Sequence, residues 1–292
     1  MRIEIGRRHY LAYLLLPHRV KTALLSQESR RRLDAINRAF NERIYSSEGA
    51  TEYDRIHRYA EAEQHDYPVR ALVDSRWVGG GYGRALELGA GSGYFTTLIA
   101  AHADLVLAVE PVPDMQAVLT ARCRRAGLDH VRVVGATAFD LPAHVGEASV
   151  DSAFILQSLH HFHRREEVFR ALGRVVRPGG RLFVVEPHHN LRRVARLFRN
   201  YLRHYRAPAF WRDERNWSTH DFLTRAELRA LARQGGFTDV RMEGYWIPFS
   251  RRLIPDPRVR FGWECVTGRL PGLRHFAAVL AMTAVRRDDG RA

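Results

Sequence analysis

Cysteine, lysine and long apolar runs are scarce in this sequence of 292 residues. The two cysteines, Cys123 and Cys265, form no CxxC pair, which excludes a disulfide framework and a thiolate metal cluster. The apolar run at residues 10–16 is far shorter than the ~20 residues that cross a bilayer, and no small-residue cleavage pattern follows it. We therefore expect a cytoplasmic protein with no transmembrane segment, no secretion signal and no bound metal.

Basic residues outnumber acidic residues by 46 to 32, which gives a formal net charge of +14, and Lys21 is the single lysine. An arginine-rich surface can follow from genomic composition alone. It can also serve an acidic partner, such as a carboxylate or phosphate substrate, a nucleic acid or a lipid headgroup. The hydrophobic share of 46% is ordinary for a globular protein and can bury a full core, which excludes global disorder.

Short apolar runs alternate with helical segments between residues 84 and 187. Their continuous hydrophobicity predicts strands that are covered on both faces, hence a parallel sheet with crossover helices. The predicted strands lie at residues 85–88, 105–109, 131–134, 152–156 and 182–185. A helix is expected over residues 164–176, and Arg177-Pro178-Gly179-Gly180 predicts a stop and turn into the next strand.

Helical segments precede this region, and a mixed segment follows it. Apolar residues at steps of three and four predict an amphipathic helix that begins near Ser26, and a second helix is expected over residues 51–65. Thr224 and Glu227 form a capping box that starts a later helix. Two further strands, expected at residues 238–243 and 276–285, should pair antiparallel at one edge because no helix is predicted between them.

Four units follow from these patterns. We expect an N-terminal helical extension over residues 1–78, an α/β core over 79–187, an inserted segment over 188–223 and a C-terminal part of the core over 224–292.

The segment ELGAGSG at residues 87–93 carries the most chemical information, because an apolar strand there runs into glycines and then a helix. Glycines let the backbone turn sharply and let a ligand lie close to the main chain. A dinucleotide fingerprint, GxGxxG, would need a third glycine where Tyr94 stands, and pyrophosphate binding favours a site with few anions. Glu87 instead places a carboxylate beside the loop, which suits a cationic ligand.

Four ordered blocks resemble the class I S-adenosylmethionine-dependent methyltransferases. They are ELGAGSG at 87–93, LVLAVE ending at Glu110, VDSAFILQSLHHF at 150–162 and RPGGRLFVVEP at 177–187. The resemblance is strong over residues 84–187 and weak over 224–285. It implies an α/β, Rossmann-like fold with a seven-stranded, mostly parallel sheet and an antiparallel edge strand, to which this chain adds the helical extension and a helical lid insertion. It also implies S-adenosylmethionine as the cofactor.

The resemblance places the cofactor at the strand ends. Glu87 and the glycine backbone would hold the methionine moiety, and Glu110 would accept bonds from both ribose hydroxyls, since a carboxylate can take two donors at once. The family often has an acid near the end of the third strand, where this chain has Thr137; its hydroxyl or Asp140 replaces that contact, or the contact is missing. The expected cofactor-binding residues are Glu87, Gly89, Ala90, Gly91, Gly93, Glu110, Pro111, Thr137, Ala138 and Gln157.

His160 and His161, after the fourth strand, are the candidate catalytic residues. Methyl transfer is an in-line displacement that depends mainly on positioning. A base is needed when the acceptor is a hydroxyl or an acidic carbon, and a histidine has a pKa suited to neutral pH. Alternatively, one histidine begins the following helix and the other packs beneath the cofactor, with no proton transfer.

The inserted segment has the pattern of a basic amphipathic helix. Arginines occupy one face at steps of four and three, namely Arg192, Arg196, Arg199, Arg203 and Arg206, and apolar residues occupy another. Such a helix can form a lid, contact an anionic substrate or a lipid surface, or bind nucleic acid, and the resemblance favours the lid. Aromatic residues that could line an acceptor pocket are Trp211, Trp217, Phe222, Tyr245 and Trp246.

Together these features predict a methyltransferase of small-molecule biosynthesis that uses S-adenosylmethionine. Its acceptor would be a small molecule, with anionic and aromatic compounds as candidates, and O-methylation is favoured over C- or N-methylation. The alternatives are a non-catalytic protein of the same fold that binds the cofactor or its demethylated product, and an RNA methyltransferase. The sequence has neither an NPPY or DPPY signature nor an RNA-binding appendage, which disfavours nucleic acid, and peripheral membrane contact stays open.

Overall fold

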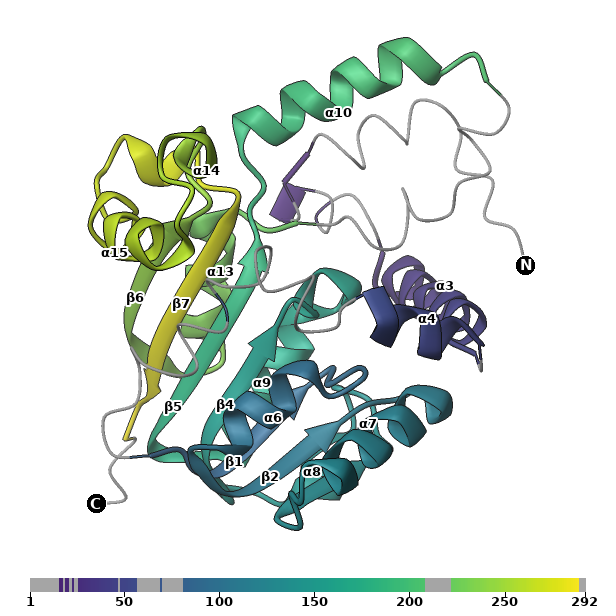
Figure 1. The fold of residues 1–292 in the computed structure, drawn as a ribbon. Coiled ribbons are helices and arrows are strands. Elements are labelled where there is room, and N and C mark those ends of the chain that lie inside the picture. The colour runs from purple at the N-terminus through teal and green to yellow at the C-terminus, as the bar shows by residue number, and fades with distance from the viewer. Residues whose placement is uncertain are drawn as a thin grey trace.

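The computed structural model describes residues 16–17, 19–20, 23, 26–46, 48–56, 69, 81–207 and 222–288. Its centre is a seven-stranded sheet with the order β3-β2-β1-β4-β5-β7-β6 (Figure 1). The strands are β1 Gly83–Leu88, β2 Ala103–Val109, β3 Val131–Val134, β4 Val150–Leu156, β5 Val176–Pro187, β6 Phe237–Tyr245 and β7 Val279–Arg286. Strands β1 to β5 pair in parallel, which confirms the expected mostly parallel sheet.

Helices cover both faces of this sheet, as the continuous apolar runs of the strands predicted (Figure 1). On one face, Leu86 and Ile155 belong to a core shared with α8 Leu141–Val145, α9 Arg165–Val175 and α13 Arg225–Gln234. On the other face, Ala85 and Phe154 belong to a core shared with α6 Tyr94–Ala100, α7 Pro113–Arg125 and α15 Pro257–Thr267. Successive strand residues point to opposite faces, so each central strand contributes to both cores.

The C-terminal strands differ from the sequence expectation. Strand β7 is antiparallel to both β5 and β6 and lies between them, so the antiparallel strand is one place in from the edge, and β6 forms the edge. The expectation that no helix separates these two strands is wrong, because α14 Ser250–Leu253, α15 and the 3-10 turn η3 Leu273–His275 lie between them in the chain. This long connection carries the chain from the edge strand back to the position beside β5.

The predicted turn at residues 177–180 lies within β5, which begins at Val176 and not at residue 182. The pairing with β4 jumps from Val150 opposite Val176 to Ser152 opposite Arg181. The extra residues of β5 form a bulge in which Gly179 has a φ of 74°, a value that glycine adopts without steric cost. Residues 177–180 therefore correctly predicted that α9 ends before them, but the prediction that β5 starts only after them was wrong.

The N-terminal extension packs at the carboxyl ends of the first strands. Helix α3 Gln27–Ile44 begins where predicted, and the Ser26 side chain caps it by accepting a hydrogen bond from the Ser29 backbone N–H. Helix α4 Glu48–Ile56 overlaps the second predicted helix, whose remainder lies outside the described residues. Ala50 of α4 packs against Val112 and Met115, which attaches the extension to the start of α7.

The insertion begins with α10 Leu191–His204, capped by the side chain of Asn190, and this helix runs along the top of the molecule in Figure 1. Helix α13 begins at the predicted capping box, in which Thr224 and Glu227 make both reciprocal bonds. Among the described helices, none combines the length and the apolar character that a bilayer crossing requires.

Candidate active site

A cavity of about 500 Å³ lies at the carboxyl ends of β1, β2 and β4, with α3 along one side. The strand order reverses at β1, because β2 and β3 lie on one side of it and β4 and β5 on the other. Parallel α/β sheets bind ligands at this kind of reversal, and the cavity falls within the range of roughly 300–1,000 Å³ for small-molecule sites.

Most of the expected cofactor-binding residues line this cavity, and three do not. Those on the wall are Gly89, Gly91, Glu110, Pro111, Thr137, Ala138 and Gln157. Those that do not line it are Glu87, Ala90 and Gly93. Of the two candidate catalytic residues, His161 lines the cavity and His160 does not.

The three glycines of the loop have different structural roles, although all have left-handed φ values, of 70° at Gly89, 55° at Gly91 and 82° at Gly93. A Cβ at Gly89 would lie 2.6 Å from the Cβ of Ser158, and a Cβ at Gly93 would overlap the side chain of Leu119. A Cβ at Gly91 would have no atom within 4 Å. Gly89 and Gly93 are therefore required by the packing of the protein itself, and Gly91 presents open main chain to the cavity.

Glu110 joins the glycine loop to the end of β2. Its Oε2 accepts from the backbone N–H of Gly91 and its Oε1 from that of Val112, each at 2.9 Å. The residue is 6% exposed; burial raises the pKa of its carboxyl, and the two amide bonds act in the opposite direction. A carboxylate offers about four acceptor positions, so Glu110 holds the loop and can still accept from a ligand.

Glu87 lies beneath the loop and faces α6, although the sequence placed it beside the ligand. Its Oε2 accepts a hydrogen bond of 2.5 Å from the hydroxyl of Thr96, and the side chain is buried. Burial raises the pKa of this carboxyl to about 8, with a smaller contribution from the charge of Glu110 and an opposing one from the Thr96 bond. Near pH 7 the group is therefore mainly a neutral acid.

The end of β4 contains a strained residue at the cavity wall. Gln157 has a φ of 56°, which is uncommon for a residue other than glycine, and its backbone N–H donates to Val185. Strain of this kind is often held in place at functional sites. The hydroxyl of the next residue, Ser158, donates to the carbonyl of Leu88 and joins β4 to β1.

Thr137 and Asp140 both line the cavity and bond to each other, because the Thr137 hydroxyl donates to Asp140 Oδ2 at 2.5 Å. The two residues that the sequence offered as alternatives thus form one unit in the loop after β3. Either can present an acceptor oxygen to a ligand.

The two histidines lie together in the 3-10 turn η2 Leu159–His161, with ring centroids 4.3 Å apart, and neither begins α9. His160 Nδ1 lies 2.8 Å from Oε2 of Glu186, whose other carboxylate oxygen accepts the backbone N–H of Leu159. Burial raises the pKa of Glu186 to about 7, although the Leu159 amide and the charge of Arg165 lower it. Glu186 was not among the predicted site residues. Its position at the end of a predicted strand, in the block VVEP, is the sequence signal that could have identified it.

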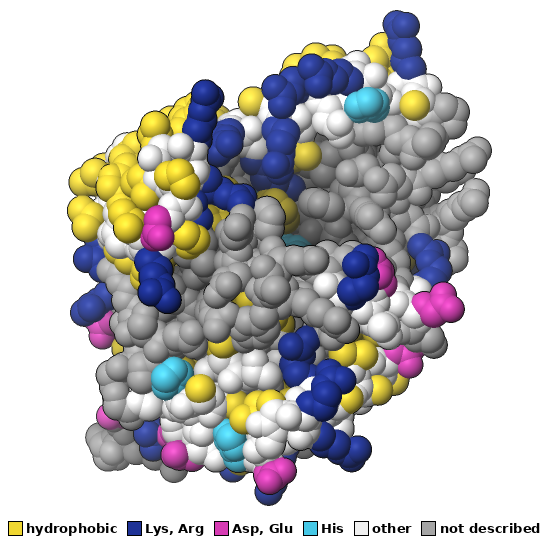
Figure 2. All heavy atoms as spheres, in the orientation of Figure 1, with side chains coloured by type: hydrophobic (Ala, Val, Ile, Leu, Met, Phe, Trp, Pro, Cys, Tyr) yellow, Lys and Arg dark blue, Asp and Glu magenta, His cyan; other side chains and the backbone are white. Residues whose placement is uncertain are grey.

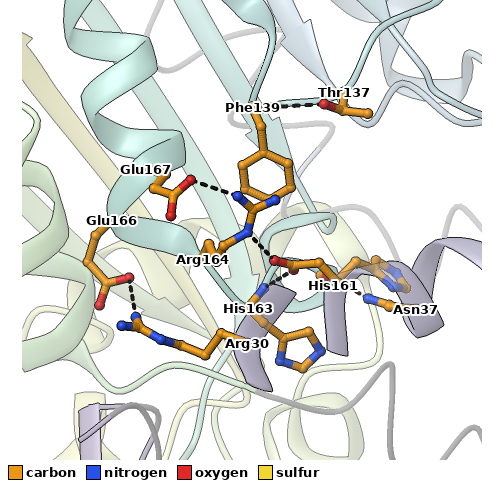
Figure 3. Close-up of polar contacts among 10 residues, drawn as sticks. Arg30, Asn37, Thr137, Phe139, His161, His163, Arg164, Glu166 and Glu167 are labelled. Atoms are coloured by element: carbon orange, nitrogen blue, oxygen red, sulfur yellow. Dashed lines mark hydrogen bonds and ion pairs between the residues drawn. The ribbon is translucent and has the colours of Figure 1, made fainter. Parts of the chain in front are cut away.

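Helix α3 contributes one side of the cavity, which the sequence did not predict. Asp34 accepts from the backbone N–H of His163 and from Nε of Arg164, both at 2.7 Å, and the Asn37 amide donates to the carbonyl of His161. Figure 3 shows the Arg164 guanidinium over the ring of Phe139, 3.8 Å from its centroid. Asp34 and Asn37 are three residues apart and so share a helix face, which is the only trace of this contact in the sequence.

Basic side chains that are buried or partly buried follow the end of β5. Arg193 of α10 bonds to Nδ1 of His189 and stacks 3.9 Å from the ring of Phe222, which in turn contacts the ring of His160. Arg225, at the start of α13, has its pKa lowered to about 10 by burial and by the positive charges of Arg274 and Arg229. One buried guanidinium nitrogen on each of Arg225 and Arg274 has no hydrogen-bond partner.

The other residues of the inserted segment and the predicted aromatic pocket divide into three groups. The predicted arginine face of α10 is exposed, while Arg193 on the same helix is buried. Tyr245 belongs to the core, where it donates to Glu243 and stacks on Phe261, so it does not form an acceptor pocket. Trp211 and Trp217 lie outside the described residues. The lid role of the insertion stays a prediction.

Known proteins share both the sequence of the core and its fold. Residues 86–184 match the family model of the methyltransferase domain. An uncharacterized methyltransferase of Mycobacterium tuberculosis is 36% identical over 102 residues, which cover 35% of this chain and 39% of that protein. A demethylmenaquinone methyltransferase of Tropheryma whipplei is 31% identical over 119 residues, which cover 41% of this chain and 48% of that protein. The chain thus spans less than half the length of these curated relatives.

Among solved structures, phosphoethanolamine N-methyltransferase 2 of Haemonchus contortus, in complex with phosphomonomethylethanolamine and S-adenosylhomocysteine, has a TM-score of 0.62. Its identity is 18%, and the match covers 86% of this chain and 61% of that chain. At that identity the likeness shows the fold alone, while the family model covers residues 86–184, which include Gly91, Glu110 and Gln157 of the cavity wall. Residues 86–184 therefore match a methyltransferase domain, and the fold that contains them is the fold of solved S-adenosylmethionine-dependent methyltransferases.

Proposed function

We propose that this protein transfers a methyl group from S-adenosylmethionine to a small-molecule acceptor. The observation that carries the proposal is the Glu110 carboxylate beside the open main chain of Gly91, on the wall of a cavity at the reversal point of the sheet. We place the reaction in a reducing compartment such as the cytoplasm, because Cys123 and Cys265 are both free thiols.

The residues on the cavity wall fit a nucleoside that bears a positive charge. Glu110 has acceptor positions left for two ribose hydroxyls, and Gly91 leaves room where any other side chain would project into the cavity. Thr137 and Asp140 present acceptor oxygens for an adenine amino group. When bound, the cofactor supplies an electrophilic methyl group on a sulfonium. The chain supplies orientation, which is the main requirement of an in-line displacement.

His161 is the base that we assign for a hydroxyl acceptor, and O-methylation is the reaction that we favour. Its imidazole lies on the cavity wall, where a ring nitrogen can take the proton that the acceptor hydroxyl loses. His160 and Glu186 lie behind it, and an ionised Glu186 would stabilise positive charge on the adjacent imidazole pair. Glu186, with a pKa near 7, is poised to respond to that charge.

For the acceptor we favour a small molecule with an anionic group. Arg193 contacts Phe222, and Phe222 contacts His160, so the Arg193 guanidinium lies one aromatic ring away from the histidine pair. Arg225 and Arg274 repel each other there, and an anion would relieve that repulsion. The phosphorylated ligand bound by the Haemonchus contortus enzyme supports an acceptor of this class.

Calorimetric titration with S-adenosylhomocysteine, the demethylated product, tests cofactor binding. Glu110→Ala should weaken binding by at least roughly 100-fold, because two charged hydrogen bonds of about 1.5–3 kcal/mol each are lost. Glu110→Gln keeps one acceptor oxygen, so its affinity for S-adenosylhomocysteine should lie between the affinities of the parent protein and Glu110→Ala. Asp129→Ala removes an exposed carboxylate from the turn before β3 and serves as the matched control. Equal affinity in Glu110→Ala and the parent protein would show that the ribose binds elsewhere.

Catalysis is tested with isotopically labelled donor and a cell extract, followed by untargeted mass spectrometry of the products. A labelled compound identifies the acceptor, and His161→Ala should then lower turnover while it spares affinity for the cofactor. Cofactor binding without any labelled product across extracts and acceptor panels would favour a non-catalytic binding protein.

A further inference from the structure

We infer that the lobe formed by residues 249–276 docks on an anionic lipid surface. This lobe comprises α14, α15 and η3, and it connects the edge strand β6 to β7 at the top of the molecule in Figure 1. The inference goes beyond methyl transfer and does not depend on it.

The lobe concentrates the exposed apolar side chains of the protein. It holds seven of the eleven large hydrophobic side chains that are exposed in the described part of the chain: Phe249, Leu253, Val259, Val266, Leu270, Leu273 and Phe276. Phe249 and Leu253 are the extremes, at 73% and 72% exposed. Figure 2 shows hydrophobic side chains gathered over α14 and α15, with arginine side chains beside them. Single exposed apolar residues are ordinary, but a contiguous patch marks an interaction site.

Positive charge predominates at the surface of the lobe, although Asp256 is also exposed. The lobe contains six arginines and two acidic residues, Asp256 and Glu264. Asp256 caps α15 by accepting from two backbone amides, and Glu264 is fully buried, where it accepts from Trp246, Ile247 and the hydroxyl of Ser250. Both acids therefore serve the fold, while Arg251, Arg252, Arg258 and Arg269 are exposed beside the apolar patch. Apolar contact combined with cationic contact matches the acyl boundary and the phosphate layer of an anionic bilayer.

Phe249 gives an independent sign that this surface is functional. Its φ of 66° is left-handed, a conformation that is strained for a bulky residue. The side chain is exposed, so the strain is not compensated by packing in the core. Its carbonyl accepts from the backbone N–H groups of Arg252 and Leu253 at the start of α14, and the exposed Arg251 and Arg252 follow it in the chain. An aromatic ring adjacent to cations is a typical element of membrane-interface contacts.

Helix α10 extends this basic and apolar surface. It runs along the same side of the molecule as the lobe, and Figure 2 shows arginine side chains along it. Leu191, Phe198 and Leu202 are exposed on the helix together with its arginines. The mixture of arginine and exposed apolar residues thus continues from the lobe along the helix that begins at the end of β5.

The test is co-sedimentation of the full chain with vesicles of phosphatidylglycerol and phosphatidylcholine, compared with phosphatidylcholine alone. We expect binding to the anionic vesicles that weakens at high salt. Each arginine at such a surface contributes about 1 kcal/mol, so the Arg251→Gln/Arg252→Gln double variant should lower the partition coefficient roughly 30-fold. Phe249→Ser/Leu253→Ser should also lower it, with no change of charge.

The matched control is Arg124→Gln/Arg125→Gln, which removes two exposed arginines from α7 and should leave vesicle binding within about twofold of the parent protein. All four positions of the lobe variants are exposed, so the folded state should persist, and circular dichroism checks it. Equal losses in the control and the arginine variant would overturn the inference, as would equal binding to both vesicle types. A parent dimer that Phe249→Ser/Leu253→Ser converts to a monomer, without vesicle binding, would instead assign the lobe to a second copy.

Discussion

The carboxyl ends of β1 and β2 differ from the end of β5 in the sign and the hydrogen bonding of their charged side chains. At β1 and β2, Glu110 and Glu87 are buried acids whose oxygens accept from Gly91, Val112 and Thr96. At the end of β5, Arg225 and Arg274 are cations that repel each other and have buried nitrogens without a hydrogen-bond partner. The first side is organised in advance for its ligand, while the second has positive charge that an incoming anion would balance.

The same contrast holds for the covering elements. Over the first side, α3 is joined to the core by the Asp34 bonds to His163 and Arg164. Over the second, α10 is attached through Asn190 and Arg193 at its first turn and exposes its apolar residues further along. The cavity wall on the first side is therefore already held in place by hydrogen bonds. The surface on the second side exposes apolar side chains that a ligand or a partner could cover.

The largest expected effect concerns the division of labour within the glycine loop. Gly93→Ala combines overpacking against Leu119 with left-handed strain and should lower the free energy of unfolding by roughly 2–5 kcal/mol. At Gly91 a new Cβ would have open space, so Gly91→Ala should lower the free energy of unfolding by only about 1–2 kcal/mol. For each kcal/mol of stability lost, Gly91→Ala should nevertheless weaken the binding of S-adenosylhomocysteine more than Gly93→Ala does. Urea denaturation and calorimetry measure both. Equal stability losses would remove the distinction between the two glycines.

A smaller effect should distinguish the buried acids by titration. The folded pKa of Glu87 is about 8, above its ordinary value of 4.5, so the folded state binds more protons than the unfolded state between these values. The free energy of unfolding should therefore fall as pH rises through this window. Glu87→Gln lacks this titratable carboxyl. Its free energy of unfolding should therefore fall less between pH 5 and 8 than that of the parent protein, by up to roughly 3 kcal/mol. Urea unfolding at three pH values, with Asp129→Asn as control, measures this. Identical slopes for all proteins would mean that Glu87 is not protonated.

The smallest effect should come from the basic cluster. Arg225→Gln removes one of two cations that repel each other, so the free energy of unfolding without added anion should stay within about 1 kcal/mol of the parent value or rise. Inorganic phosphate at ten times its dissociation constant should stabilise the parent by about 1.4 kcal/mol and the variant less. Arg233→Gln, which removes an exposed arginine from the last turn of α13, is the control. Equal stabilisation of all three proteins by phosphate would place the anion elsewhere.

Local patterns in the sequence were sufficient for the core and for half of the site. The apolar runs predicted β1 to β5 because strands that are buried on both faces are mostly apolar along their length. Gly91 was found because an apolar strand that runs into glycines is a local signal, and Glu110 was found because the resemblance places a carboxylate at the end of the second strand. Glu186 and Asp34 were missed, since their partners, Leu159 and His163, are 27 and 129 residues away in the chain. The place of β7 was missed for the same reason, because strand order depends on pairing between distant segments.

The sequence by itself determined that residues 84–187 form a parallel sheet with a glycine-rich turn and two acids at its strand ends, because hydrophobic period and turn chemistry act over a few residues. Only the tertiary structure decided which acid faces the cavity, since Glu110 reaches it and Glu87 turns toward α6. It also decided that α3 forms a wall, that Arg193 is buried, and that the positive charges of Arg225 and Arg274 act on each other. These outcomes depend on how distant segments pack, and burial then sets the pKa values and the charge balance on which the proposed chemistry rests.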